Sequence, residues 1–268
     1  MYTQSTNRVI TSIYGLLPDT NYNIEVVESA QAGDAGTRNE ANKGSLSVHT
    51  DFEYVTLNVR DFGAYGNGEH DDTLAIQTAI MACPENARVY VPAGTYKITT
   101  LFLKSNLVLD LAKDAVLSAF TERERFGILP GMIQSYDEKD EYNLGSWEGN
   151  PLDCFTGIIT GINVENVVIT GEGTIDGCAS FDNWWKDAKI RKIAWRPRLV
   201  FISHCKNVLL HGVTVTNSPS WTLHPYFTDN IRFVDLKVIN PANSHNTDGL
   251  DPESCTGVEI VGVYFCLL

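Results

Sequence analysis

The sequence predicts an all-β fold: a parallel β-helix with a short N-terminal capping helix, preceded by a remnant of a β-sandwich module. Three observations support this prediction. A polar-apolar motif recurs along the chain, and one helical segment is followed by nothing but short strands. Asn-Gly and Asp-Gly turns do not recur at the spacing of about 8–12 residues that a sandwich requires. We therefore expect a partial module over residues 1–50 and a C-terminally truncated β-helix over residues 51–268.

The first region has the pattern of β-strands. Apolar and polar residues alternate over residues 22–26, which is typical of a half-buried strand, and a second strand is expected around residues 46–50. Residues 17–22 (Leu-Pro-Asp-Thr-Asn-Tyr) resemble the tyrosine corner of a fibronectin type III module, in which the phenol fixes the approach to a strand. Because a complete module needs about 90–100 residues, this region is interpreted as a partial one.

The second region opens with the predicted capping helix. Asp71 and Asp72 are placed to cap a helix over residues 73–83, and apolar residues recur within it at helical spacing. A strand is expected over residues 89–96. A single helix before a long run of short strands is typical of a cap at the end of a β-structure.

A repeat follows, in which an asparagine precedes alternating apolar residues. The copies lie at residues 106–111, 166–171, 207–212 and 230–235, and a glycine replaces the asparagine at 257–262. The last two intervals are 23 and 27 residues, which suits one coil of three short strands. Each coil must stack on its neighbours to bury its apolar face. Asparagine tolerates the left-handed turn conformation, and stacked asparagines can form a hydrogen-bonded ladder.

Two long segments interrupt the coils. They span about residues 121–153 and residues 178–198, and the second contains Trp184, Trp185 and Trp195. Long loops on a solenoid usually lie on its binding face, so we expect both insertions to border a binding site.

Composition limits the class of protein. A net charge of −13 argues against a nucleic-acid partner, and the sequence has no apolar run long enough to cross a membrane. The spacing of the six cysteines matches no zinc motif, so buried free thiols are expected, with disulfides as the alternative. No cofactor or metal is expected. No apolar signal core follows Met1, which predicts either a cytoplasmic protein or a secreted one whose N-terminus is missing.

The segment Asn-Thr-Asp-Gly-Leu-Asp at residues 246–251 places two carboxylates three residues apart. In extended backbone, Asn246 and Asp248 face one side and Thr247 faces the other. Gly249 is expected to leave room for a ligand near the backbone. Taken alone, so short a motif is equally compatible with a polar turn between coils.

Together and in order, several segments resemble the polygalacturonases of glycoside hydrolase family 28. They are residues 61–64, 71–73, 91–96, 171–177, 196–200, 217–224 and 246–249. The resemblance covers about residues 57–265 and implies a right-handed, pectin-lyase-like solenoid that hydrolyses α-1,4-linked galacturonic acid with inversion. A fibronectin-type module ahead of the β-helix is similar to bacterial exo-acting members, which favours exo action.

The resemblance also implies roles for residues. Asp248 matches a carboxylate that helps to activate water, and Asn246 lies beside it as a substrate-binding residue. Inversion needs a general acid as well, which the family carries in a Gly-Asp-Asp motif one coil later, ahead of Gly-His-Gly and Arg-x-Lys motifs. This sequence has none of the three at the right place, so negligible hydrolase activity is expected of this chain itself. The last three residues, 266–268, are not relied on as native.

Three further residues are candidates for substrate binding. His224 lies one coil before Asp248 and either lines the same site or is structural. Asp251 either contacts sugar hydroxyls or caps a turn. Arg198 ends a cluster of basic residues over 186–198 that either attracts the carboxylates of an oligogalacturonide or forms a solvated face.

Four functions compete on this sequence. The first is a polygalacturonase, acting on pectic polysaccharide or oligogalacturonides, with its oligomeric state open. The second keeps the fold and hydrolyses rhamnogalacturonan or xylogalacturonan. A calcium-dependent pectate lyase is the third, and the Asn-Thr-Asp motif argues against it. The fourth is a non-catalytic β-helix that binds polysaccharide.

Overall fold

The structure is a computed structural model of the chain, and it describes residues 3–6, 8, 10–27, 43–134 and 141–267. It divides into two compact units: Ile13–Tyr54, and Val55–Leu268 together with Met1–Ser12. The predicted boundary at residue 50 therefore lies close to the observed one. The grouping of the first twelve residues with the second unit differs from the prediction, because the contacts that decide it join positions far apart in the sequence.

The unit Ile13–Tyr54 contains a pair of antiparallel strands. These are β1 (Asn21–Val27) and β2 (Lys43–His49). The phenol oxygen of Tyr22 accepts a hydrogen bond from the Leu17 N–H at 2.8 Å, which is the contact expected of a tyrosine corner. The assignment to a fibronectin type III module stays a prediction.

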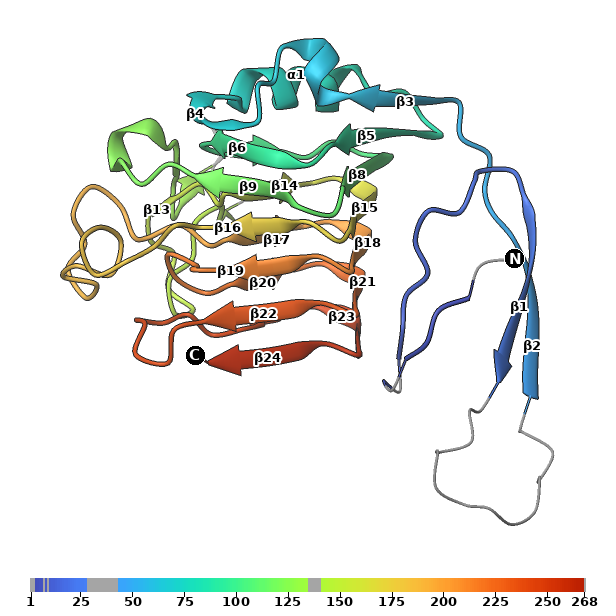
Figure 1. The fold of residues 1–268 in the computed structure, drawn as a ribbon. Coiled ribbons are helices and arrows are strands. Elements are labelled where there is room, and N and C mark those ends of the chain that lie inside the picture. The colour runs from blue at the N-terminus through green and yellow to red at the C-terminus, as the bar shows by residue number, and fades with distance from the viewer. Residues whose placement is uncertain (1–2, 7, 9, 28–42, 135–140, 268) are drawn as a thin grey trace. The chain divides into compact units, whose positions relative to one another are not determined.

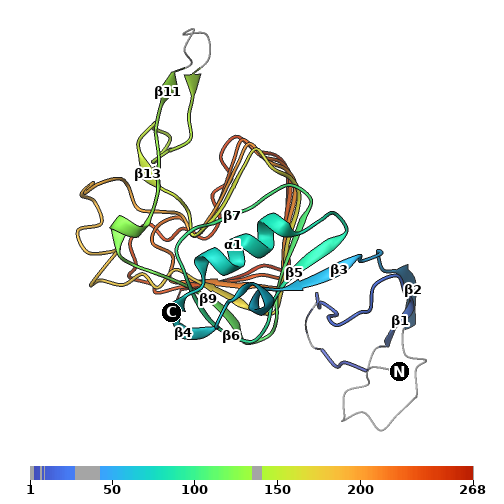
Figure 2. The same ribbon diagram turned by 90° about the horizontal axis from the view of Figure 1, so that it is seen from above.

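The second unit is a stack of coils whose strands form three parallel sheets (Figures 1 and 2). Sheet one contains, in stacking order, β3 (Val55–Asn58), β5 (Ala87–Val91), β8 (Leu107–Leu111), β15 (Glu165–Gly171), β18 (Lys206–His211), β21 (Asp229–Val234) and β23 (Thr256–Val261). Sheet two contains β4 (Asn67–Asp71), β6 (Gly94–Ile98), β9 (Ala115–Ala119), β16 (Thr174–Asp176), β19 (Thr214–Thr216), β22 (Lys237–Asn240) and β24 (Tyr264–Leu267). Sheet three contains β7 (Leu101–Phe102), β14 (Ile159–Ile162), β17 (Val200–Ser203) and β20 (Leu223–Tyr226).

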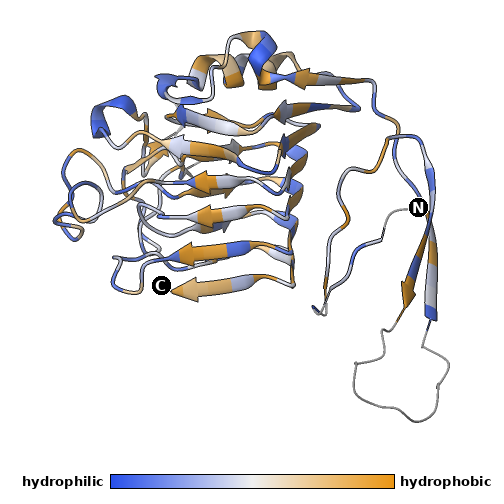
Figure 3. Cartoon of the chain, in the orientation of Figure 1, coloured by the Kyte–Doolittle hydropathy of each residue, from blue (hydrophilic) through white to orange (hydrophobic). Residues whose placement is uncertain are grey.

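The core runs through the inside of the stack. In sheet one, Leu107, Val167, Val208 and Ile231 pair in register and are almost completely buried. Apolar residues lie along the strands, and many polar residues lie in turns and insertions (Figure 3). Each coil thus buries its apolar side chains against the coils above and below it, and the predicted parallel β-helix is confirmed.

The repeated asparagines form the predicted ladder at the turn before sheet one. Asn166 donates to Asn106 at 2.9 Å, Asn207 donates to Asn166 at 3.0 Å, and Asn230 donates to Asn207 at 3.3 Å. All four have φ between 54° and 57°, in the left-handed region. Gly257 continues the column with φ 66°, which explains why glycine replaces asparagine in the last copy.

The predicted helix is α1 (Thr73–Ala82), and it lies over the first coil together with the 3₁₀ helix η1 (Val59–Phe62) (Figure 2). Asp71 accepts from the Thr73 N–H at 3.1 Å at the start of the helix. Asp72, however, makes no capping hydrogen bond. Its buried carboxylate accepts from the backbone N–H groups of Tyr65 and Gly66, so it fixes the preceding turn.

Both predicted insertions leave the stack on the same side (Figure 1). The first contains η2 (Arg123–Arg125), β10 (Ile128–Leu129), β11 (Ile133–Gln134), β12 (Glu141–Tyr142) and β13 (Cys154–Phe155). In the first insertion β10 pairs with β13, and β11 pairs with β12. The second lies between β16 and β17 and consists of turns. Within the described part of the chain, no helix is long and apolar enough to cross a membrane.

Candidate functional site

The segment after Asp248 continues sheet three by one row. Leu250 pairs with Leu223 as a parallel bridge, and the Thr222 N–H donates to the Asp248 carbonyl at 2.8 Å. The Asp251 N–H donates to the Leu223 carbonyl at 2.9 Å. This register places Asp251 next to His224, so the parallel stacking brings two of the predicted site residues together.

The Asn-Thr-Asp motif presents its side chains as predicted, although it lies outside the named strands. Thr247 is buried, whereas Asp248 is exposed and Asn246 is partly exposed. The prediction for Gly249 was wrong. A Cβ atom at this position would lie 2.5 Å from the ring of Phe265, so the glycine makes room for packing between coils and not for a ligand.

His224 is enclosed and held in one tautomer. Its Nδ1 accepts from the Arg198 Nε at 3.3 Å, which requires the proton to sit on Nε2, and Nε2 then donates to Glu253 Oε2 at 3.1 Å. Burial lowers the pKa of His224 to about 4, and the hydrogen bond to Glu253 opposes this only in part. The imidazole is therefore neutral near neutral pH. Sequence reasoning missed Glu253, which follows Asp251 on the same side of an extended segment.

Asp251 is a partly buried carboxyl group. Its Oδ2 atom is enclosed and has no hydrogen-bond partner in the protein. Burial raises the pKa of Asp251 to about 6, the charge of Asp248 raises it further, and the charge of Arg198 opposes both. A buried polar atom without a partner costs free energy, and this distinguishes Asp251 from an ordinary turn residue.

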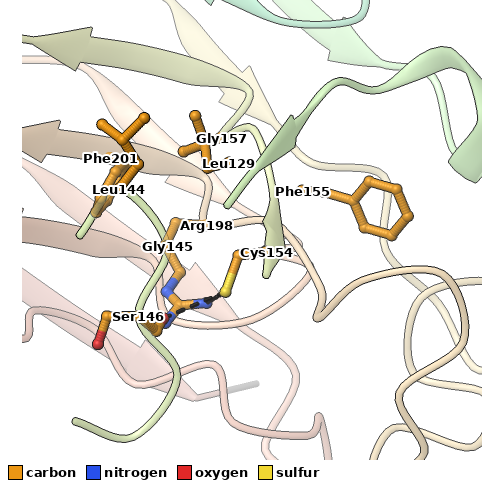
Figure 4. A pocket seen from close by; sticks show the side chains of 9 residues that line it. All are labelled: Leu129, Leu144, Gly145, Ser146, Cys154, Phe155, Gly157, Arg198 and Phe201. Atoms are coloured by element: carbon orange, nitrogen blue, oxygen red, sulfur yellow. Dashed lines mark hydrogen bonds between the residues drawn. The ribbon is translucent and has the colours of Figure 1, made fainter. Parts of the chain in front are cut away.

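Arg198 differs from the expectation that it contacts substrate directly. It is 4% exposed, and its guanidinium donates to the Ser146 carbonyl, to the Arg196 carbonyl and to Cys154 Sγ (Figure 4). The same group lies over the rings of Trp147 and Trp221, at 4.8 Å and 4.9 Å from their centres. Its hydrogen bond to His224 therefore makes Arg198 a support for the histidine.

The basic cluster of the second insertion is divided by the fold. Lys186, Lys189, Arg191 and Lys192 are exposed, whereas Arg196 and Arg198 are buried. Only the exposed part remains available to attract a charged ligand through solvent.

The described residues contain no group of three or more His, Cys, Asp or Glu side chains that could hold a metal ion. All six cysteines are free thiols, three of them buried. The chemistry available at the site is therefore that of carboxyl groups, a neutral imidazole and amide donors.

The opposite pKa shifts of Asp251 and His224 predict a pH dependence. Asp251 has a folded-state pKa of about 6 against an ordinary 3.8, so the folded protein holds the extra proton between these values and its contribution to stability falls as pH rises. His224 has a folded-state pKa of about 4 against 6.5, so its contribution rises over the same range. Relative to the unmutated chain, Asp251→Asn should gain stability between about pH 4.5 and pH 6, and His224→Gln should lose it.

Urea unfolding at the two pH values measures both effects. The Asp182→Asn variant changes an exposed aspartate and serves as the control. Changes of the same sign for Asp251→Asn and His224→Gln would contradict the prediction.

Comparison with known proteins identifies the class and then the family. Residues 136–265 match the sequence profile of the glycosyl hydrolases family 28, and residues 56–110 match that of rhamnogalacturonase A/epimerase, pectate lyase-like. A hyperthermoactive exopolygalacturonase from Thermotoga maritima has the same fold, with a TM-score of 0.62 at 24% identity over 81% of this chain and 55% of that one. The fold is therefore that of the right-handed parallel β-helix proteins.

Two relatives are similar in sequence. A probable polygalacturonase from Vitis vinifera is 30% identical over 240 residues, or 85% of this chain and 47% of that protein. An endo-polygalacturonase from Pectobacterium parmentieri is 30% identical over 203 residues, or 70% of this chain and 47% of that protein. The chain thus contains a glycosyl hydrolase family 28 domain. It spans about half the length of these curated relatives.

Proposed function

We propose that this protein hydrolyses α-1,4-galacturonosidic bonds in polygalacturonate or oligogalacturonides with inversion. One observation carries the proposal. In a family 28 domain, the exposed Asp248 lies at the edge of the row that continues sheet three, beside Asp251 and the enclosed His224. The relatives named above are polygalacturonases, and their names support the same substrate class.

In this proposal Asp248 accepts the proton of the attacking water, and Asn246 and Asp251 bind sugar hydroxyls. The unpartnered Oδ2 of Asp251 supports the second role, because a hydroxyl donor would satisfy it. An inverting hydrolase also needs an acid to protonate the leaving oxygen. This sequence does not supply the Gly-Asp-Asp motif, so we infer that the chain as given binds substrate without turning it over.

Exo action is supported by the position of the first insertion. Leu129 and Leu144 from this insertion pack with Phe201 and Tyr226 in a cluster separate from the main core, and Asn143 donates to the Tyr226 hydroxyl at 3.0 Å. The insertion therefore covers the outer face of sheet three in the rows before Asp248. A substrate chain blocked on that side is cleaved from its end.

Hydrolysis of another pectic linkage is the second candidate. The match of residues 56–110 to the rhamnogalacturonase A/epimerase profile favours it over the lyase and the non-catalytic binder. Its substrate would carry rhamnose or xylose next to galacturonic acid.

Product analysis separates these functions. The protein, extended to include the family's acid motif, is incubated with polygalacturonate, rhamnogalacturonan and xylogalacturonan. The proposal expects saturated monogalacturonate released from polygalacturonate, first as the inverted anomer in proton NMR spectra. Unsaturated ends that absorb in the ultraviolet would show a lyase. Preference for either branched polymer would favour the second candidate, and binding without any product would favour the non-catalytic reading.

A further inference from the structure

We propose that Arg196 is a positioning residue that fixes the Asn246 side chain and the backbone leading to Asp248. The role rests on the proposed function, in which Asp248 activates water. Arg196 is 2% exposed, and its Nη1 donates to the carbonyls of Pro219 and His245, each at 2.7 Å. Its Nη2 donates to Asn246 Oδ1, also at 2.7 Å. One guanidinium therefore holds two consecutive residues just before Asp248.

The bonding of Arg196 is unusual for a buried cation. Its hydrogen-bond partners are neutral carbonyl and amide oxygens, and none of the described ion pairs involves it. Burial lowers the pKa of Arg196 to about 10, which still leaves it charged at neutral pH. Burying a charge without a carboxylate is costly, and hydrogen bonds from a charged donor are stronger than neutral ones. Such an arrangement favours geometry over stability.

The contact decides which end of the Asn246 amide faces the site. A guanidinium only donates hydrogen bonds, so the amide oxygen must face Arg196. The NH₂ group is then the end that remains to donate to a substrate. Asn246 also adopts the left-handed conformation, with φ 54°, which sets the direction of the chain into Asp248.

The motif is held from its other side as well. Asn240 Nδ2 donates to the Thr247 carbonyl at 3.3 Å and to Thr222 Oγ1 at 2.9 Å. The Thr222 N–H donates to the Asp248 carbonyl. Residues 245–248 are thus fixed through Arg196 and Asn240, and the Asp248 side chain projects from a rigid support.

Both insertions contribute to this support. Trp147 of the first insertion stacks on Trp195 of the second, with ring centres 4.6 Å apart and planes at 12°. The Arg196 guanidinium lies 5.4 Å from the centre of the Trp147 ring. The stacked rings therefore help to exclude water from the hydrogen bonds of Arg196, and they link the position of the insertions to that of the motif.

The test compares Arg196→Met, Arg196→Lys and the control Arg232→Met, which changes an exposed arginine paired with Glu259 on β21. Affinity for trigalacturonate is measured by calorimetry on folded protein, and the side-chain amide of Asn246 is followed by ¹⁵N NMR. Arg196→Met should weaken binding by about tenfold or more, as expected when a charge-assisted hydrogen bond is lost. It should also shift the Asn246 amide signals and speed hydrogen exchange at residues 246–248. Arg196→Lys should lie between, because an ammonium reaches fewer of the three acceptors.

Unchanged affinity and unchanged Asn246 signals in folded Arg196→Met would overturn the proposal, even if its melting temperature falls. If Arg196→Met does not fold, the same criteria apply to Arg196→Lys. Failure of the unmutated chain to bind trigalacturonate would count against the proposed function. The role of Arg196 would then be decided by the Asn246 signals and the hydrogen exchange.

Discussion

Replacing Asp248 with asparagine is expected to lower the rate of polygalacturonate hydrolysis by about 10²–10⁴-fold, the usual contribution of a general base. Asparagine has nearly the same size but cannot take a proton from water. The Asp248 side chain is exposed, and its backbone carbonyl keeps the hydrogen bond from Thr222. The substitution should therefore remove the chemistry and leave the fold unchanged.

The rate is measured as galacturonate released by the form of the protein that carries the acid motif. Asp229→Asn, an exposed aspartate at the start of β21, serves as the control and should keep the parent rate. In the chain as given, Asp248→Asn should bind trigalacturonate at least as tightly as the parent, because it removes a negative charge facing an anionic sugar. A variant that keeps more than about a tenth of the parent rate would contradict the assignment of Asp248 as the base.

Replacing Trp184 with alanine should lower the free energy of unfolding by about 3–5 kcal/mol. The side chain is fully buried, and its ring meets those of Phe126 and Phe155 edge-on, at 5.6 Å and 5.7 Å between centres. The Arg123 guanidinium lies 4.4 Å from the ring centre. Alanine would leave a cavity where the second insertion is anchored to the first.

Trp184→Phe is the matched variant and should cost less than about 1.5 kcal/mol. It keeps most of the aromatic volume and removes an indole N–H that is buried without a hydrogen-bond partner. Urea unfolding followed by far-ultraviolet circular dichroism measures both variants without relying on tryptophan fluorescence. A loss below about 1 kcal/mol for Trp184→Ala would show that the insertion is not anchored through this ring.

The solenoid was predictable because its signals are local and repeated. The asparagines at the start of each copy, the apolar residues that follow them and the helix over residues 73–83 each have a meaning in their own segment. The outward direction of Asn246 and Asp248 followed from alternation alone. Asp72 was assigned the wrong partner, because the turn that binds its carboxylate comes from residues before the helix.

The amino-acid sequence by itself thus determined the coil repeat, the ladder, the insertions and the motif that carries Asp248. Only the tertiary structure decided which side chains surround that motif. The enclosure of Arg198, the pairing of His224 with Glu253 and the hydrogen bonds of Arg196 to His245 and Asn246 join residues 26 to 50 positions apart. Such contacts depend on which coil stacks on which and on how the insertions fold back. Neither is encoded in the pattern of any single segment, so burial and charge at the site become visible only when the coils are assembled.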